Sequence, residues 1–491
     1  MSAIPGAVET DRQPPMTVPL RYFVVGLAFL VAGGAVGVLS ATGVVSGVTR
    51  LAHVHLLVVG WVCVTILGAM TQFVPVWSNV ALHSRRLATA ALWLVTVGVA
   101  GIAWSFAAGA LAWVHAWGVL ALVGFWVAVY NLGRTLARAR PWDVTERHFA
   151  LALACFVAVP ALGLALSMGY LAPVFVHLPV TRGAAVATHG TLAVFGIVLT
   201  TVLGALTQLV PMFTQTDIEG RTRALQRTEA VAYPAGVVAL AGGRLVASPL
   251  LARAGAALVV VGLLAFAVVV ARLLVATRVE RTPMLARYAV VAVAMAAWAL
   301  QAGRAWVVDP VALAADPAAL GRGEWLGDPL VAAPFGGAPH LLFVGVVGFV
   351  VLGTLYHVVP FIVWVHRYSD LLGREPVPMI DDLYDDRIAR ADFVATVAGG
   401  AGLIAAAQFD LPSAVTVGAG ALATLGFVLV ATNLVLVVRE HGPGSLRGVL
   451  VTRLADGNHV AAGTDDGPVA TGTNDSPAAD DAPGTADEAA R

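Results

Sequence analysis

Long apolar segments recur along almost the whole chain, separated by short polar stretches that contain Arg, Pro and Gly. A helix of roughly 20 apolar residues is long enough to cross a bilayer. By this criterion the pattern predicts about twelve transmembrane helices, near residues 22–45, 51–77, 87–110, 112–133, 148–172, 184–212, 229–247, 251–274, 284–308, 339–365, 391–409 and 413–438. The predicted fold is an all-α integral membrane domain over residues 21–440, between an N-terminal segment, 1–20, and a polar tail, 441–491.

One motif occurs three times in this pattern, in residues 50–77, 188–213 and 339–361. Alignment of its Leu-Gly pairs brings further residues into register. The shared positions are Gly68, Gly204 and Gly353; Gln72, Gln208 and His357; and Pro75, Pro211 and Pro360. The motif falls on the second, sixth and tenth predicted helices, which we call the first, second and third motif helices. The chain is therefore predicted to consist of three pseudo-symmetric blocks of four helices.

Histidines lie at the start of each motif helix. In the same alignment His189 takes the position of His53, and His340 takes the position of His55, whereas Ala338 stands where a third copy of His53 would be. A histidine within a membrane helix is costly and usually faces the bundle interior or a cavity. Hydrogen bonding between helices is one explanation. For an aligned set, ligation of a cofactor is the explanation that we favour.

Ligand chemistry narrows the choice of cofactor, because neutral imidazole binds haem iron, copper and zinc. The two cysteines, Cys63 and Cys155, lie within apolar runs and are expected to be buried thiols. His53 and His55 are two residues apart, so on a helix they point about 200° away from each other. They can therefore serve two sites on opposite sides of one helix. The predicted cofactor ligands are His53, His55, His189 and His340, with His357 as a further candidate metal ligand.

Composition agrees with a membrane protein, since 59% of the residues are hydrophobic and only 12% are charged. The formal net charge is zero, which gives no basic surface for nucleic acid. All 29 basic residues are arginine, and most of them follow even-numbered helices. By the positive-inside rule, both termini are predicted to be cytoplasmic in a multi-pass protein of the cell membrane, with the histidines near the outer face. The tail from residue 456 carries eight acids against one arginine and is expected to be disordered.

Twelve helices in three blocks, with histidines on the second, sixth and tenth, resemble subunit I of the haem-copper oxidase superfamily, which includes the nitric oxide reductases. The local likeness is to the cbb-type oxidases, over the residues His53-Val54-His55, Gly60-Trp61-Val62, Gly68-Ala69 and Pro75. In that family this pattern belongs to the tenth helix, whereas here it stands on the second. The tenth helix keeps Leu355-Tyr356-His357 and Pro360. The resemblance extends in topology over about residues 20–438.

This resemblance implies haem b, one or two per chain, and leaves two assignments open. In direct order, a low-spin haem would lie between His53 or His55 and His340. If the block order is rotated by one, His55 and His189 would flank a low-spin haem, and His53 would hold a second haem that His340 faces. Copper or non-haem iron is not favoured in either case, because the family places a histidine pair on the seventh helix and this chain has none there.

The expected function is electron transfer to, or binding of, oxygen or nitric oxide, with a quinol, cupredoxin or cytochrome as donor. If the protein turns over, it would be an oxidoreductase of the terminal oxidase or nitric oxide reductase type. Alternatives are a haem- and copper-containing membrane protein of the nitric oxide tolerance type and a non-catalytic haem sensor or assembly factor. A cofactor-free transporter with threefold repeats is the second alternative. Arg304 and Arg322 are candidates for neutralising haem propionates.

Overall fold

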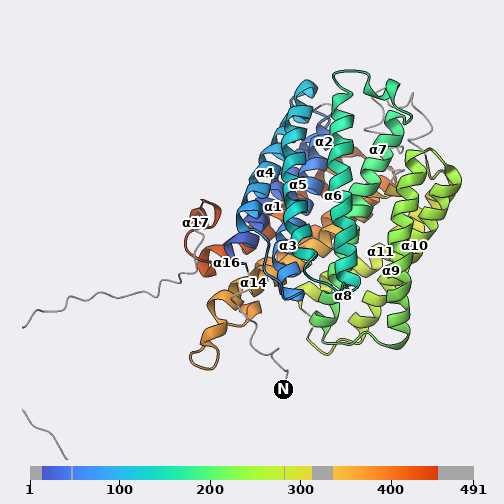
Figure 1. Cartoon of the computed structure of the whole chain (residues 1–491). Helices are drawn as coiled ribbons and strands as arrows, with labels where there is room; N and C mark the ends of the chain where they lie inside the picture. The colour runs from blue at the N-terminus through green and yellow to red at the C-terminus, as the bar shows by residue number, and fades with distance from the viewer. Residues whose placement is uncertain (1–13, 46–47, 281, 312–334, 452–491) are drawn as a thin grey trace, which may run out of the picture. The chain divides into compact units, whose positions relative to one another are not determined.

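The computed structural model describes residues 14–45, 48–280, 282–311 and 335–451 (Figure 1). Within these ranges the chain is helical and forms no β-strand. The segments, in order, are α1 Thr17–Ala41, α2 Thr49–Val54, η2 His55–Cys63, α3 Val64–Trp77, α4 Arg85–Ala107, α5 Val114–Leu136, α6 Val144–Met168, α7 Arg182–Thr191, η5 Leu192–Leu199, α8 Thr200–Thr214, α9 Gly220–Leu245, α10 Pro249–Val275, α11 Pro283–Val308, η8 Leu341–Gly348, α14 Phe349–Arg367, α15 Asp386–Gln408, α16 Ser413–His441 and α17 Leu446–Val451. Arg322, residues 1–13 and the acidic tail from 456 lie outside the described residues.

Eleven helices of the described chain are long and apolar enough to cross a membrane. The remaining predicted span corresponds to α9, a helix of 26 residues. Its first half carries Arg221, Arg223, Arg227 and Glu229, which lower its hydropathy. The prediction of an all-α integral membrane protein with about twelve long helices is confirmed.

Helix contacts follow the same order in all three blocks and close into a cycle. The first helix of each block packs on the motif helix: α1 on η2 and α3, α6 on η5 and α8, and α11 on η8 and α14. The third helix packs on the fourth: α4 on α5, α9 on α10, and α15 on α16. The fourth then packs on the first helix of the next block: α5 on α6, α10 on α11, and α16 back on α1 (Figure 1).

Glycines allow each motif helix to approach the first helix of its block closely. A Cβ atom on Gly60 would lie 2.6 Å from Cγ of Phe29, and one on Gly68 would lie 2.4 Å from Cβ of Tyr22. Both distances are too short for a side chain, so α1 can pack here only against glycine. The equivalent glycines are Gly196 and Gly204 against α6, and Gly345 and Gly353 against α11.

Each motif helix contains a π-helical segment at the same place in the repeat. The segments η2, η5 and η8 precede α3, α8 and α14. The amide N–H groups of Val64, Thr200 and Phe349 each point to the carbonyls three and five residues earlier. π-Helical turns are rare and occur frequently at functional sites. Three π-helical segments occur at one repeat position beside the histidines. This agreement indicates that a functional site lies at this level of the bundle.

We call the end of the motif helices with His53, His55, His189 and His340 the histidine end, and the opposite end, with Gln72 and Gln208, the glutamine end. Two buried carboxylates lie toward the glutamine end. Oε1 of Glu229 on α9 lies at hydrogen-bond distance, 2.9 Å, from Nε2 of His148 on α6, and both side chains are buried. Asp392 on α15 pairs with Arg287 on α11 and also accepts from the hydroxyl of Tyr356.

The Arg287–Asp392 pair gives a stability prediction. Both side chains are buried, and the further partners of Arg287 are uncharged: the backbone carbonyls of Pro283 and Ala389 and the rings of Tyr356 and Phe393. Removing one member of a buried ion pair leaves an uncompensated charge, so Asp392→Ala should lower the unfolding free energy by about 3–5 kcal/mol. Unfolding of the detergent-solubilised protein, followed by circular dichroism, measures this loss. Asp386→Ala, at the exposed start of the same helix, is the matched control; equal losses in both variants would contradict the prediction.

Candidate functional site: two histidine pairs

His53 and His189, which share one repeat position, are held in the same way by the first helix of their own block. Nδ1 of His53 lies 2.7 Å from the carbonyl oxygen of Gly33 on α1. Nδ1 of His189 lies 3.1 Å from the carbonyl oxygen of Val159 on α6. A carbonyl only accepts, so Nδ1 must carry the proton in each ring, and the lone pair of neutral imidazole is then on Nε2.

Each of these two rings also lies against a glycine on that first helix. A Cβ atom on Gly37 would lie 2.5 Å from Cε1 of His53, and one on Gly163 would lie 3.1 Å from Cε1 of His189. Both glycines stand four residues after the carbonyl that accepts from the ring. The carbonyl and the glycine together fix the direction in which each imidazole points.

The other repeat position contains His55, Thr191 and His340. Nδ1 of His55 lies 2.8 Å from the carbonyl oxygen of Leu51, one turn earlier on its own helix, which again leaves Nε2 free as an acceptor. Thr191 makes the same type of bond, donating to the carbonyl of Ala187 at 2.6 Å. Nδ1 of His340 is buried and has no hydrogen-bond partner in the part of the chain that the structure describes.

The histidines form two pairs, each shared between two motif helices. His55 and His189 line one pocket and are close enough to interact electrostatically. His340 and His53 are likewise within electrostatic reach of each other. The same relation holds for both pairs: the histidine at the second repeat position of one motif helix is within electrostatic reach of the histidine at the first position of the next, in the cyclic order of the blocks.

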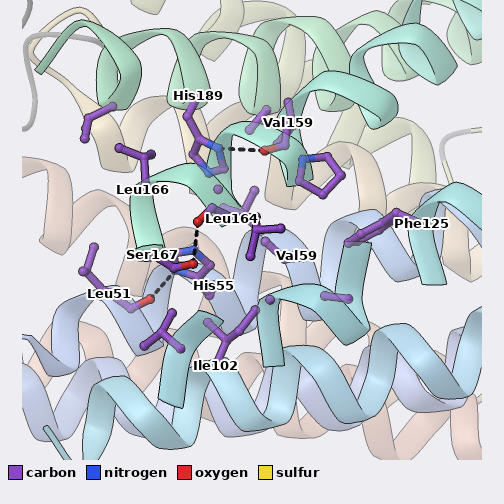
Figure 2. A pocket seen from close by; sticks show the side chains of 18 of the residues that line it. Leu51, His55, Val59, Ile102, Phe125, Val159, Leu164, Leu166, Ser167 and His189 are labelled. Carbon is purple, nitrogen blue, oxygen red and sulfur yellow. Dashed lines mark hydrogen bonds between the residues drawn. The ribbon is translucent and has the colours of Figure 1, made fainter. Parts of the chain in front are cut away.

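The pocket of the first pair is a cavity of about 190 Å³, with both rings pointing into it (Figure 2). Side chains of α2, η2, α4, α5, α6, α7 and η5 line it, and they are almost all apolar. The aromatic and aliphatic walls include Val59, Ile102, Phe106, Phe125, Phe156 and Leu164. This volume is slightly larger than the ~150 Å³ of an apolar cavity that binds benzene.

One cation, Arg182 at the start of α7, lines the same cavity. Its Nη1 donates to the carbonyl of Leu166 at 2.7 Å, and its guanidinium lies over the ring of Tyr170 at 4.9 Å. Burial raises the pKa of the Tyr170 hydroxyl, and the positive charge of Arg182 acts in the opposite direction. Among the described residues Arg182 has no acidic ion-pair partner. The cavity is therefore apolar with an uncompensated positive charge at the histidine end.

The third equivalent position, between the second and third motif helices, has neither histidine. Thr191 and Ala338 stand in their places, and larger side chains fill the space around Thr191. Arg244 on α9 donates to Thr191 Oγ1 at 2.6 Å and lies over the ring of Trp306. Trp298 contacts Trp306 with ring centroids 5.7 Å apart, and its Nε1 donates to a backbone carbonyl. At this position tryptophan and arginine side chains thus stand in place of a histidine pair.

His357 is not brought to either pair. It lies at the glutamine end, ~25 Å along its helix from His340 at 1.5 Å per residue. Its ring centroid is 4.4 Å from that of Phe213 and 5.9 Å from that of Phe361. The described residues contain no group of three or more His, Cys, Asp or Glu side chains that could hold a metal ion.

Sequence reasoning missed Arg182 and pointed to two other arginines instead. Arg304 is exposed on α11, and Arg322 lies outside the described residues. Arg182 looked like an isolated loop residue, and the signal that could have found it is its place seven residues before His189, two turns away on the same helix.

Comparisons with protein-family models and with curated proteins find no match for this chain.

The filled third position gives a second prediction. Trp298 is fully buried, and truncation of a buried tryptophan costs roughly 3–5 kcal/mol. Trp298→Ala should therefore lower the unfolding free energy by about this amount while leaving the His55–His189 cavity intact. Thermal unfolding in detergent measures it against Trp104→Ala, whose side chain is 55% exposed on α4. An unchanged melting temperature for Trp298→Ala would show that this position is not packed as described.

Proposed function

We propose that the protein is a membrane-embedded haem protein that transfers electrons, with one haem b between His55 and His189 and a second between His53 and His340. The single observation that carries this proposal is the orientation of His55 and His189. Both enter one apolar cavity, and both use Nδ1 on a backbone carbonyl. A carbonyl that binds Nδ1 fixes the tautomer and raises the basicity of Nε2, the usual arrangement of a metal-ligating histidine.

The donor set fits haem iron better than a small metal ion. Two neutral imidazoles from opposite walls provide axial ligands, whereas a closed zinc site takes four ligands. The apolar walls suit the face of a tetrapyrrole, and Arg182 provides a cation for its carboxylates. A tetrapyrrole needs several times the room of a benzene ring, so flexible wall side chains such as Leu164 and Ile102 would have to turn aside.

The residues of the chain have separate tasks in this proposal. Haem iron with two imidazole ligands supplies one-electron redox chemistry when bound. His55 and His189 hold the ring, Gly163 keeps the imidazole of His189 in position, and Arg182 orients the carboxylate edge toward the histidine end. His53 and His55 are only two residues apart, and their side chains project from opposite sides of one helix. The first motif helix would thereby connect the two haems.

The wider role follows from the resemblance to cytochrome c oxidase subunit I. We propose that a quinol, a cupredoxin or a cytochrome donates electrons, that oxygen or nitric oxide is the acceptor or ligand, and that the protein resides in the cell membrane with both termini cytoplasmic. The histidine end would then face outward. The nitric oxide tolerance type of haem protein has the same donor requirements and remains the alternative.

A second candidate function, binding of oxygen or nitric oxide, is favoured by one observation at the other pair. Among the described residues, Nδ1 of His340 has no partner equivalent to the carbonyls that hold the other three imidazoles. A ligand whose ring is not fixed dissociates more readily, so a gas would compete for iron at His340 while His53 stays bound.

Haem stoichiometry tests the two-site proposal. The purified chain should contain two haems, and His55→Ala, His189→Ala or His53→Ala should lower the content to one. His340→Ala should retain both, because His53 still holds the second haem. A pyridine haemochrome assay and the absorbance spectrum measure the content. Thr191→Ala, at the position equivalent to His55, is the matched control and should retain both haems. A chain without haem absorbance would reject the proposal and favour a cofactor-free transporter.

Carbon monoxide distinguishes the electron-transfer and gas-binding functions. With four bound imidazoles, the reduced spectrum should not change on addition of carbon monoxide, whereas His340→Ala should create a site that binds it. If gas binding is the function, the wild-type protein should already respond, and His55→Ala should leave that response in place. A wild-type response that His55→Ala abolishes and His340→Ala preserves would contradict the assignment of gas binding to the second pair.

A further inference from the structure

A concave basic surface lies at the glutamine end, where two membrane helices stop together. α14 ends at Arg367 and α16 ends at His441, and the chain then turns through Gly444, which has a φ of 93°. The short helix α17 follows and packs on α1, with Val449 fully buried. Nε of Arg21 donates to the carbonyl of Val449 from inside the bundle. The turn is therefore anchored at both ends.

Three arginines line this surface, together with one acid. Arg367, Arg439 and Arg447 are exposed. Arg367 donates to the backbone carbonyl of Glu440 at 3.2 Å and lies over the ring of Tyr368. None of the three forms an ion pair with an acidic side chain in the part of the chain that the structure describes. The remaining lining residues are Glu440, Gly442, Gly444, Ser445 and Leu446. The residues that line the hollow therefore carry three positive charges and one negative charge.

We propose that this hollow binds a phosphate group, specifically the headgroup phosphate of an anionic phospholipid. Guanidinium groups match phosphate geometry through paired N–H donors and are favoured wherever phosphate is recognised. The hollow lies at the ends of two membrane-spanning helices, which is the depth of the lipid headgroups. Basic pockets between transmembrane helices bind such headgroups.

The neighbouring surface favours a lipid over free phosphate. Val451, at the end of α17, is 67% exposed, and Leu446 lines the hollow. Apolar side chains beside a phosphate site are compatible with an acyl chain but offer nothing to an inorganic ion. This site is separate from the histidine pairs and does not rest on the proposed function.

Lipid titration of the full-length protein tests the proposal. The protein is delipidated in detergent, phosphatidylglycerol or phosphatidylcholine is added, and bound lipid is counted by native mass spectrometry. Wild type should bind phosphatidylglycerol in preference to phosphatidylcholine. Arg439→Gln combined with Arg447→Gln should weaken phosphatidylglycerol binding roughly 30-fold, since each arginine near a charged lipid contributes about a factor of five.

Controls separate the possible sources of the phosphate and the effects of folding. Arg387→Gln with Arg390→Gln removes two exposed arginines at the start of α15, at the same end of the bundle, and should leave binding unchanged. Inorganic phosphate that competes as well as the lipid would assign the hollow to a free anion and overturn the lipid proposal. Unchanged lipid affinity in the Arg439/Arg447 variant, with an unchanged circular dichroism melt, would overturn the site itself.

Discussion

The close approach of each motif helix to the first helix of its block is the constraint on which the rest of the bundle depends. Two glycines, eight residues apart on the motif helix, allow the close crossing with α1, α6 or α11. An added Cβ atom would lie under 3.0 Å from a neighbour at five of the six positions and 3.2 Å from Cβ of Arg287 at Gly353. Because the two helices touch there, the carbonyls of Gly33 and Val159 come within hydrogen-bond distance of His53 and His189. Backbone contact thus positions the imidazoles, without any help from a ligand.

The threefold organisation was accessible from the sequence because its signals are local. Apolar length gives the spans, and the Gly, Gln and Pro positions give the repeat. The pairing of the histidines was not accessible, since it depends on which helices meet across the bundle. Two assignments were open from the sequence. In the structure His55 and His189 line one pocket, a pairing that the rotated assignment uses. His53 and His340 are within electrostatic reach of each other, a pairing that both assignments allow.

Other features escaped sequence reasoning for identifiable reasons. The π segments have no residue signature beyond a glycine and depend on the whole helix. Glu229 and Asp392 stood at the edges of predicted spans, where a charge is unremarkable. The helices α9 and α15 in fact start earlier, at Gly220 and Asp386, so both acids lie inside them and are buried. An error of a few residues in a helix start decides whether an acid is in water or in the core.

The displaced oxidase-like pattern on the second span has a simple account in this architecture. In a cyclic arrangement the three motif helices occupy equivalent positions, so a histidine pair can stand on any of them and still reach both neighbours. The three positions differ in the side chains that occupy them. Two have a pair of histidines, and the third has Trp298, Trp306 and Arg244. The resemblance to haem-copper oxidases remains a hypothesis that the haem assays address.

The filled position also determines how the blocks are joined. A ligand shared by His55 and His189 would tie the first block to the second, and one shared by His53 and His340 would tie the third block to the first. The junction between the second and third blocks would have no such tie. There α10 packs on α11, Trp298 packs on Trp306, and Arg244 adds hydrogen bonds. This junction therefore needs no ligand to form, whereas each of the two junctions of the first block would have to close around one.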